Sequence, residues 1–516
     1  DGDTWRAAVD TDTDGLFDDE KAMTNFRAER QFATFGDEDL LNFVLNIYNE
    51  GDVLSIVADA GSHGTHVAGI AAAYFPDQPE LNGMAPGAQI VSVKIGDTRL
   101  GSSSVNTGFT RGVISVIEND VDMINMSYGG PTAFPDIRYR IDRIASELVH
   151  DHGVVFVSSA GNSGPALSTV GGPGGSTSAI IGVGASITPS MMEAQYAVRE
   201  GHSEMQYPWS SRGPTLDGDM GVDITAPGGA ISPVPNWTLQ KNQLSNGTSM
   251  SSPSACGGIA LILSKLEQDG QAWHPASVKR AIKATAVPIP DQSPWAQGPG
   301  MLQVDAAYEY LANYVDDASR DVRYEARGPG RTRGIYLREP FETDEPVEVA
   351  LQLAPRWPED SDNRRKVDFE MRLKLEATEP WIETARFHNL ASSGRSTNVR
   401  VDPTGLEHGA HFAQILAYDE DHPELGPVFT FPVTVIKGME TDPAQGHAYR
   451  ETITTTNGGL QKWFFHAPVG ATWMDVIIKR RDTDTSRTLV VHTTQLRDDQ
   501  AFSTYNNRGW VTFNDE

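Results

Sequence analysis

The stretch Val154-Val155-Phe156-Val157-Ser158-Ser159-Ala160-Gly161-Asn162 joins an apolar run to a turn of small and polar residues. Such a run is typical of a short strand that is buried on both faces of a parallel sheet. Similar runs stand at Ile90–Ile95, Met123–Met126 and Ile180–Val183, and helix-like segments lie near 108–118, 137–150 and 252–268. This alternation, from about residue 54 to residue 312, predicts an α/β domain whose parallel sheet is flanked by helices.

The pattern changes after about residue 312. Phe369–Leu375 alternates apolar and charged residues, which indicates a half-buried antiparallel strand. Comparable alternation recurs in four further segments, which turn residues separate: 347–353, 412–418, 429–436 and 473–478. We therefore expect an antiparallel β-sandwich domain over residues 313–440 and the start of a second β-rich domain over 441–516.

Length, charge and cysteine content argue against several classes of protein. A chain of 516 residues is long enough for two to four domains, and its formal net charge of −28 argues against binding to nucleic acid or to an anionic membrane. The single cysteine, Cys256, excludes an intrachain disulfide, and its apolar surroundings predict a buried thiol. No stretch is long and apolar enough to span a bilayer.

The first 52 residues are acidic and irregular, and they show no clear core pattern. Asp10, Asp12 and Asp14 resemble the front of a calcium loop, but Lys21 stands where such a loop carries its glutamate. A solvated acidic turn is the preferred interpretation, with calcium as the alternative. No other cofactor or metal is expected.

Three segments carry residues suited to acyl transfer. The segment from Gly61 to Ala72 places His63 just before a helix of small residues, and Asn162 stands where a buried strand ends in a glycine-rich turn. Ser249 lies in Asn246–Pro253, ahead of an apolar helix whose first turn would accommodate Pro253. Each residue has an ordinary structural explanation: an exposed histidine, a turn asparagine or a serine at a helix N-terminus.

Together, in the order His, Asn, Ser, these segments resemble the subtilase family. The match rests on HGTHVAG from His63, INMSYGG from Ile124, SSAGN ending at Asn162 and GTSMSSP from Gly247. The resemblance implies a subtilisin-like parallel sheet, with the three residues at the carboxyl ends of successive strands. It also implies peptide hydrolysis through a Ser-His-Asp triad and an acyl-enzyme.

The roles of individual residues follow from the same resemblance. His63 would be the general base and acid, Ser249 the nucleophile and Asn162 a donor to the oxyanion. Two short segments would line the substrate cleft: Ser127-Tyr128-Gly129 would pair with the substrate backbone, and Ser159-Ala160-Gly161 would form the opposite wall.

Within the family, the chain resembles the tripeptidyl peptidase II branch. The similarity is carried by residues 82–100, WSSRGP from Trp209, RGIYLREP from Arg333 and PVGATWMDV from Pro468. It implies that residues 1–52 end an insertion between the catalytic Asp and His, and that 53–312 form the peptidase domain.

Two departures from that branch matter. No D-[ST]-G motif precedes His63, so we expect the catalytic aspartate upstream of Asp1 and regard the chain as a fragment that alone is poorly active. The two glutamates that hold the substrate ammonium correspond to Ser104 and Gly130. We therefore expect endopeptidase activity rather than strict tripeptide release.

Two other functions remain open at this stage. The first is a catalytically decayed subtilase that acts as a binding or assembly module. The second is a zinc hydrolase using His63 and His66, for which the sequence offers no third ligand. The expected partners are peptides or unfolded proteins, with a possible homo-oligomer through the β domains. The resemblance implies a cytoplasmic location, with secretion or the periplasm as the alternative.

Overall fold

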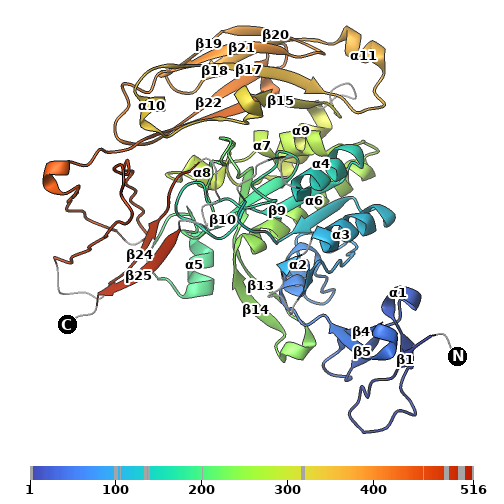
Figure 1. Cartoon of the computed structure of the whole chain (residues 1–516). Coiled ribbons are helices and arrows are strands. Elements are labelled where there is room, and N and C mark those ends of the chain that lie inside the picture. The colour runs from blue at the N-terminus through green and yellow to red at the C-terminus, as the bar shows by residue number, and fades with distance from the viewer. Residues whose placement is uncertain are drawn as a thin grey trace. The chain divides into compact units, whose positions relative to one another are not determined.

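The computed structural model describes residues 4–97, 103–104, 106–132, 136, 140–199, 201–314, 320–456, 458–481, 487–497 and 506–513. The chain divides into two compact units (Figure 1). The first comprises residues 1–112 and 229–246, and the second comprises 113–228 and 247–516.

The first unit begins with a small β-rich body. Its elements are β1 (Arg6–Ala7), β2 (Met23–Thr24), α1 (Phe26–Glu29), β3 (Ala33–Phe35), β4 (Leu41–Tyr48) and β5 (Val53–Ala58). Antiparallel pairing joins β1 to β2 and builds the sheet β3-β4-β5, while Met23, Phe43 and Leu45 form a buried cluster. The expectation that residues 1–52 are irregular and lack a core pattern is therefore wrong. Short strands with few buried positions do not produce a visible periodicity.

The remainder of the first unit consists of α2 (His63–Ala72), β6 (Gly96–Asp97), β7 (Ser103–Ser104) and the antiparallel hairpin of β13 (Gly229–Pro233) and β14 (Asn242–Asn246). The small residues of α2 allow a close approach to this hairpin: a Cβ at Gly69 would lie 2.4 Å from Ser232 Oγ. The Ser232 hydroxyl donates to the carbonyl of His66 at 2.7 Å, and His66 Nε2 lies 2.9 Å from the carbonyl of Gln243. The helix α3 (Asn106–Glu118) continues the chain into the second unit.

A mostly parallel sheet forms the centre of the α/β part of the second unit. Its strands are β8 (Met123–Met126), β9 (Val155–Ser159), β10 (Ile181–Ile187), β11 (Met205–Gln206) and β12 (Ile224–Pro227). The order is β11-β10-β9-β8, and β12 also pairs with β10; all pairs are parallel except β10 with β11. The helices of this part are α4 (Arg140–Asp151), α5 (Pro189–Tyr196), α6 (Thr248–Gln268), α7 (Pro275–Ala284), α8 (Pro294–Gln297) and α9 (Val304–Tyr314).

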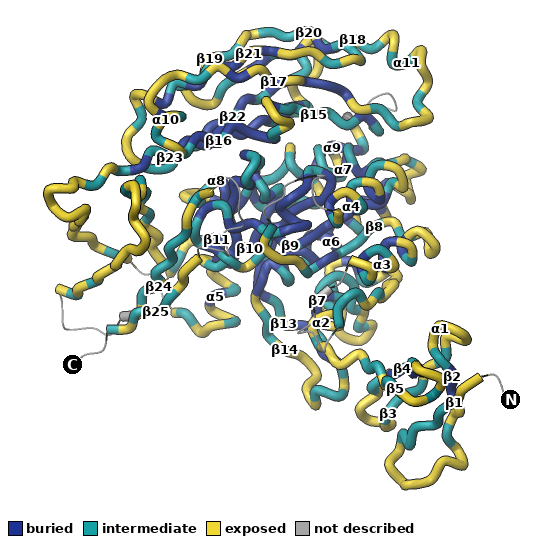
Figure 2. The backbone as a smooth tube through the Cα atoms, viewed as in Figure 1, coloured by how far each residue is buried: buried dark blue, intermediate teal, exposed yellow. Residues whose placement is uncertain are grey.

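These elements confirm the α/β class and three of the four predicted buried strands. The largest apolar cluster joins β9, β10 and β12 to α6, α7 and α9, and Figure 2 shows this centre as a continuous dark-blue region. Val157, Val183 and Ile259 are fully buried there. The predicted helix over 137–150 corresponds to α4, although residues 137–139 lie outside the described part of the chain.

A β-sandwich follows. One sheet has the order β15-β17-β21-β19 and the other β16-β23-β22-β18-β20. The bounds of its elements are β15 (Arg323–Arg327), β16 (Ile335–Leu337), α10 (Pro340–Thr343), β17 (Val347–Arg356), α11 (Asn363–Asp368), β18 (Glu370–Ala377), β19 (Ile382–Thr384), β20 (Phe387–Ala391), β21 (Arg395–Val401), β22 (Gly409–Asp419) and β23 (Pro427–Lys437). Alternate residues of β17 are buried, as the sequence predicts for a half-buried strand.

Two predicted strands are absent. Ile90–Ile95 and Trp473–Ile478 form no strand, and Ile90, Val91, Trp473 and Ile477 are exposed. An apolar run reports the character of side chains, whereas a strand also requires a neighbouring backbone to pair with. Among the described residues after β23, pairing occurs between β24 (Arg487–Thr493) and β25 (Asn507–Phe513), and residues 439 and 465 form a single bridge.

None of the described helices combines the length and apolar character that crossing a bilayer requires. Cys256 is buried in α6, and burial raises the pKa of its thiol to about 12. The thiol therefore remains protonated and behaves as a small core residue.

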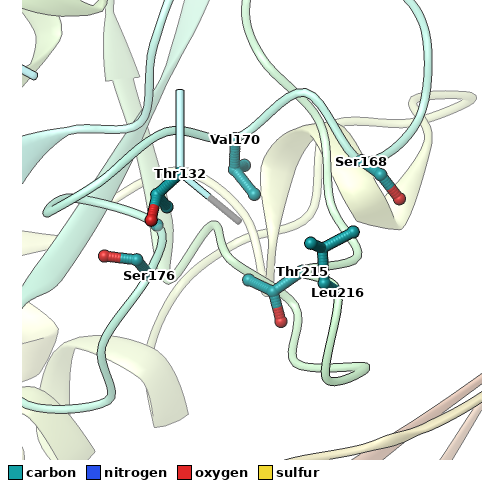
Figure 3. A pocket seen from close by; sticks show the side chains of 7 residues that line it. Thr132, Ser168, Val170, Ser176, Thr215 and Leu216 are labelled. Carbon is teal, nitrogen blue, oxygen red and sulfur yellow. The ribbon is translucent and has the colours of Figure 1, made fainter. Parts of the chain in front are cut away.

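A buried carboxyl in the second unit is hydrogen-bonded to Ser176, a residue that lines a small cavity. Asp142 in α4 is completely buried; its Oδ1 accepts the Ser176 hydroxyl at 2.8 Å, while its Oδ2 has no partner among the described residues. The cavity, of about 20 Å³, has room for about one water. Figure 3 shows its lining residues Thr132, Ser168, Val170, Ser176, Thr215 and Leu216. Burial raises the pKa of Asp142 to about 7.

This carboxyl predicts a pH-dependent stability. The unfolded chain ionises Asp142 near pH 4 and the folded chain only near 7, so the free energy of unfolding falls as the pH rises through that window. Asp142→Asn keeps the oxygen that accepts from Ser176 and removes the charge. As the pH rises from about 5 to about 8, the free energy of unfolding should fall by about 2 kcal/mol less in the variant than in the parent. Urea unfolding at both pH values measures the difference, and parallel losses in both proteins would contradict the prediction.

Candidate active site

A cavity of about 280 Å³ opens in the second unit at the carboxyl ends of β8 and β9. Its lining is made of the segments that follow these strands, a glycine pair and the start of α6. The lining residues are Ser127, Tyr128, Gly129, Gly130, Pro131, Ser159, Ala160, Gly161, Asn162, Ser163, Thr169, Gly171, Gly172, Thr248 and Ser249. The structure thus brings together eight of the nine site residues predicted from the sequence, and the roles assigned to them remain predictions.

Backbone hydrogen bonds hold the two walls of this cavity. Gly130 and Gly172 exchange two N–H···O bonds of 3.0 and 2.8 Å, and the N–H of Gly171 donates to the carbonyl of Ala160 at 3.1 Å. Glycine is required at position 129, because a Cβ there would lie 2.5 Å from the carbonyl oxygen of Gly172. The walls of the cavity are therefore set by the main chain.

The orientation of the Asn162 amide follows from its neighbours. The backbone N–H of Thr248 lies 2.9 Å from Asn162 Oδ1, and the Thr248 hydroxyl lies 2.9 Å from the same atom. A backbone N–H can only donate, so the amide atom that faces it is the oxygen. The Thr248 hydroxyl in turn accepts the N–H of Gly161 at 3.2 Å. The Nδ2 group of Asn162 is therefore left to donate to a ligand in the cavity.

The helix that carries Ser249 begins earlier than predicted. Its first residue is Thr248, so Ser249 lies in the first turn and Pro253 in the second. The expectation that Pro253 occupies a first helical turn is therefore wrong. Proline has no N–H, so the carbonyl of Ser249, four residues earlier, has no helical donor. That carbonyl instead accepts the Ser127 hydroxyl at 2.8 Å.

A chain of side-chain hydrogen bonds ties the start of α6 to the end of β8. Asn125 Oδ1 accepts the Ser252 hydroxyl at 2.7 Å, and Asn125 Nδ2 donates to Ser127 Oγ at 3.2 Å. Ser127 then donates to the main chain of Ser249. Thr248 and Ser249 both line the cavity, and Ser249 is the more exposed of the two, because Thr248 is buried and Ser249 is half-buried.

Ser127→Ala tests this link. The variant leaves the Ser249 carbonyl without a donor, so we expect kcat to fall about tenfold at a nearly unchanged KM, as for the loss of one hydrogen bond to a partly buried group. Ser127→Thr, which retains a hydroxyl, should recover most of the rate. Ser146→Ala is a matched control, because its hydroxyl also donates to a carbonyl, that of Asp142, within α4. Kinetics of Ser127→Ala equal to those of the parent would refute the role.

His63 is the first residue of α2 in the first unit. Its side chain is exposed, yet partial desolvation and then the His66 ring lower the pKa of His63 below its ordinary value. The positive end of α2 also disfavours an imidazolium at this position. A neutral imidazole is the form that can accept a proton. His66, by contrast, is buried and its Nε2 contacts the carbonyl of Gln243, so the pair is not arranged as two free zinc ligands.

The predicted placement of the three residues at the ends of successive strands of one sheet holds only for Asn162, which follows β9. The strand before α2 is β5 of a small antiparallel sheet, and the strand before α6 is β14 of a hairpin. Asn125 and Thr248 also hold the site together, and neither was predicted as a site residue. The position of Pro253, four residues after Ser249, was the signal for the freed carbonyl that Ser127 binds.

The acidic loop near the start of the chain has a defined geometry. Oxygens of Asp10, Asp12 and Asp14 lie within 4.8 Å of one another, the one such group of potential metal ligands within the described ranges. The carboxylates also accept backbone N–H groups, including those of Thr13 and Leu16. Glu20 instead caps the N–H and hydroxyl of Thr11. Calcium at this loop stays a prediction.

Comparisons with known proteins show which family the chain resembles over most of its length. Residues 9–320 match the model of the subtilase family, and residues 322–436 match that of the first Ig-like domain of tripeptidyl-peptidase II. The chain is 44% identical over 511 residues to tripeptidyl-peptidase 2 of Oryza sativa subsp. japonica, which covers 96% of this chain and 38% of that protein. It is 38% identical to tripeptidyl-peptidase 2 of Drosophila melanogaster, with 96% and 35% covered.

A crystal structure of tripeptidyl peptidase 2 superposes with a TM-score of 0.79 at 34% identity, covering 98% of this chain and 41% of that one. The chain therefore spans about two fifths of the length of these relatives. The family model covers more than half of the present chain and includes both α2 and the cavity residues. On these grounds the chain belongs to the subtilase family.

Proposed function

We propose that this chain carries the nucleophile, the general base and the oxyanion site of a serine peptidase of the tripeptidyl peptidase II type. The observation that supports this most is the cavity in which Ser249 and the free Nδ2 of Asn162 are held together. Ser249 lies in the first turn of α6, where backbone N–H groups have no helical acceptor and negative charge is favoured.

The proposed reaction follows from these groups. Ser249 Oγ attacks the substrate carbonyl and transfers its proton to His63, and Asn162 Nδ2 donates to the oxyanion. His63 then protonates the leaving amine, and an acyl-enzyme remains on Ser249. A water activated by His63 hydrolyses the ester and restores both residues.

The substrates in this proposal are peptides or unfolded proteins. The segment from Ser127 to Gly130 is an extended wall of the cavity and can pair with a substrate backbone. At position 130 a Cβ would meet nothing within 4 Å, so the mouth is open there. An open mouth without a carboxylate at this position favours passage of a longer chain over capture of a free amino terminus.

A matched pair of fluorogenic tripeptides tests both the activity and the mode of cleavage. One has a free amine and the other is acetylated. We expect hydrolysis of both by the active protein, with values of kcat/KM that differ by less than about tenfold. A hundredfold preference for the free amine, about 2.7 kcal/mol of transition-state binding, would show an ammonium anchor and refute the endopeptidase mode. Hydrolysis of neither would favour the decayed, binding-module alternative.

Gly130→Glu is the companion variant. The substitution places a carboxylate in an open part of the mouth, where it can form a charge-assisted hydrogen bond with a substrate ammonium. We expect the ratio of free-amine to acetylated kcat/KM to rise by about tenfold or more. Gly130→Gln, of the same shape but uncharged, is the control and should leave the ratio near that of the parent.

Assembly through the β domains remains part of the proposal. Val469, Trp473 and Ile477 are exposed large apolar residues of the segment that follows the sandwich, and such residues favour contact with another surface. Sedimentation of Trp473→Ser against the parent would measure their contribution.

A further inference from the structure

Arg212 is a buried cation without a counter-charge. Only 5% of the residue is exposed, and its Nε is buried without a hydrogen-bond partner. Its backbone is fixed: the N–H donates to Thr169 Oγ1 at 3.0 Å, and the carbonyl accepts the N–H of Thr169 at 2.9 Å. Within the described part of the chain, the guanidinium itself forms neither a hydrogen bond nor an ion pair.

Arg333 shows how the same unit satisfies a comparably buried guanidinium. It is also 5% exposed, but its Nε donates to Asp217 at 2.7 Å and its Nη1 lies 2.9 Å from Asp219. A buried charge without such partners is unfavourable by several kcal/mol. The contrast between the two arginines indicates that Arg212 lacks a partner that its position requires.

A second cation, Lys462, is connected to the Arg212 segment through Trp295. Lys462 belongs to the extended segment after the sandwich, and its Nζ is 5.9 Å from the ring centroid of Trp295. The carbonyl of Trp295 accepts the N–H of Gly213, the residue after Arg212, at 3.0 Å. Burial and then the charge of Arg212 lower the pKa of Lys462 to about 7. Lys462 likewise forms no hydrogen bond or ion pair with any residue that the structure describes.

The segment carrying Lys462 packs through alternate residues against the α/β part of the second unit, which is the proposed peptidase part. Lys462, Phe464 and His466 are half-buried, whereas Trp463 and Phe465 are exposed. Phe464 joins the apolar cluster of Trp295 and Leu167, on the segment that passes alongside α8 (Figure 1). Two acids contact this stretch, and both are held by residues other than the lysine. Glu440 lies 2.6 Å from His466 Nδ1, and Glu451 accepts from Trp463 Nε1 at 2.7 Å.

We propose that Arg212 and Lys462 together bind one oxyanion group, a carboxylate, a sulfate or a phosphate, at the junction of the peptidase part and the extended segment. A planar guanidinium binds two oxygens of such a group, and an ammonium adds a point charge to the same group. The anion supplies the counter-charge that both cations lack. Because the whole chain has a net charge of −28, bulk attraction does not account for anion binding at this place.

Sulfate is the first probe, because its charge does not change near neutral pH. Calorimetric titration at constant ionic strength and about pH 6.5, below the pKa of Lys462, should show saturable binding. Lys462→Met should weaken it by about tenfold or more, as for the loss of one charge-assisted hydrogen bond. Lys479→Met is the matched control, since Lys479 is an exposed lysine of the same segment, and it should bind as the parent does.

A second arm identifies the source of the oxyanion. An acetylated tripeptide with a free carboxyl terminus is compared with the same tripeptide as its amide, using Ser249→Ala to prevent turnover. Tighter binding of the acid than of sulfate, lost in Lys462→Met, assigns the site to a polypeptide carboxylate. The reverse order assigns it to a free inorganic anion.

Two results would overturn the proposal. One is the absence of saturable binding of either probe to the parent. The other is equal binding by Lys462→Met and Lys479→Met. Arg212→Lys provides an independent check should the first substitution disturb the segment, because it retains the charge but loses the two-point contact, and it should also weaken binding by about tenfold.

Discussion

Ser249→Ala is expected to lower turnover by about 10⁶, because removal of the nucleophile from a subtilisin-type triad leaves only binding and oxyanion stabilisation. Ser249 is the half-buried residue of the first turn of α6, between two buried neighbours, and its backbone is held from the end of β8. The change is measured as kcat on a fluorogenic peptide. In the active protein a fluorophosphonate probe should modify Ser249, as located by peptide mass mapping, and should not modify the variant.

Ser251→Ala is the matched control for this experiment. Ser251 belongs to the same helix, is completely buried, and its hydroxyl has no partner among the described residues. Labelling and turnover should therefore stay near those of the parent. Labelling at another serine, or undiminished hydrolysis by Ser249→Ala, would remove Ser249 from the proposed reaction.

Asn162→Ala carries the second largest expected effect. Loss of one oxyanion donor lowers kcat by about 10²–10³, or about 2.7–4 kcal/mol of transition-state stabilisation, with little change in KM. The amide is suited to this role because its oxygen is occupied by Thr248 and its Nδ2 is free. Steady-state kinetics on the acetylated tripeptide measure both constants.

Asn162→Asp distinguishes the role of Asn162 as a donor to the oxyanion from its role as an acceptor that holds Thr248. The carboxylate can still accept both hydrogen bonds from Thr248, but an oxygen replaces the donor and brings negative charge to the oxyanion. We expect a loss of kcat at least as large as in the alanine variant. If Asn162 served only to hold Thr248, the aspartate variant would instead retain nearly full activity.

Much of this architecture could be predicted from local pattern. The strands β8, β9 and β10 are short apolar runs ending in turns, and the sandwich strands alternate with period two. Seven of the predicted cavity residues lie in dense motifs at the ends of β8 and β9, and Ser249 lies in such a motif at the start of α6. In each case the pattern that allows the prediction is contained within about ten residues of sequence.

The remaining features depend on distant partners. Ile90–Ile95 has strand-like composition but pairs with no strand in the described regions. Asn125 and Ser252 are 127 residues apart, and their hydrogen bond is invisible in either local segment. Asp142 resembles an ordinary acid in the first turn of a helix, and only the tertiary packing makes it a completely buried carboxyl.

The hairpin of β13 and β14 has a consequence for biosynthesis. It belongs to the first unit, but it is translated after most of the sheet of the second unit. His66 meets its acceptor on Gln243 only after a further 177 residues have been synthesised, roughly 10–35 s at usual ribosomal rates. Until then the face of α2 that receives Ser232 is unprotected on the nascent chain, so a chaperone has time to bind this helix.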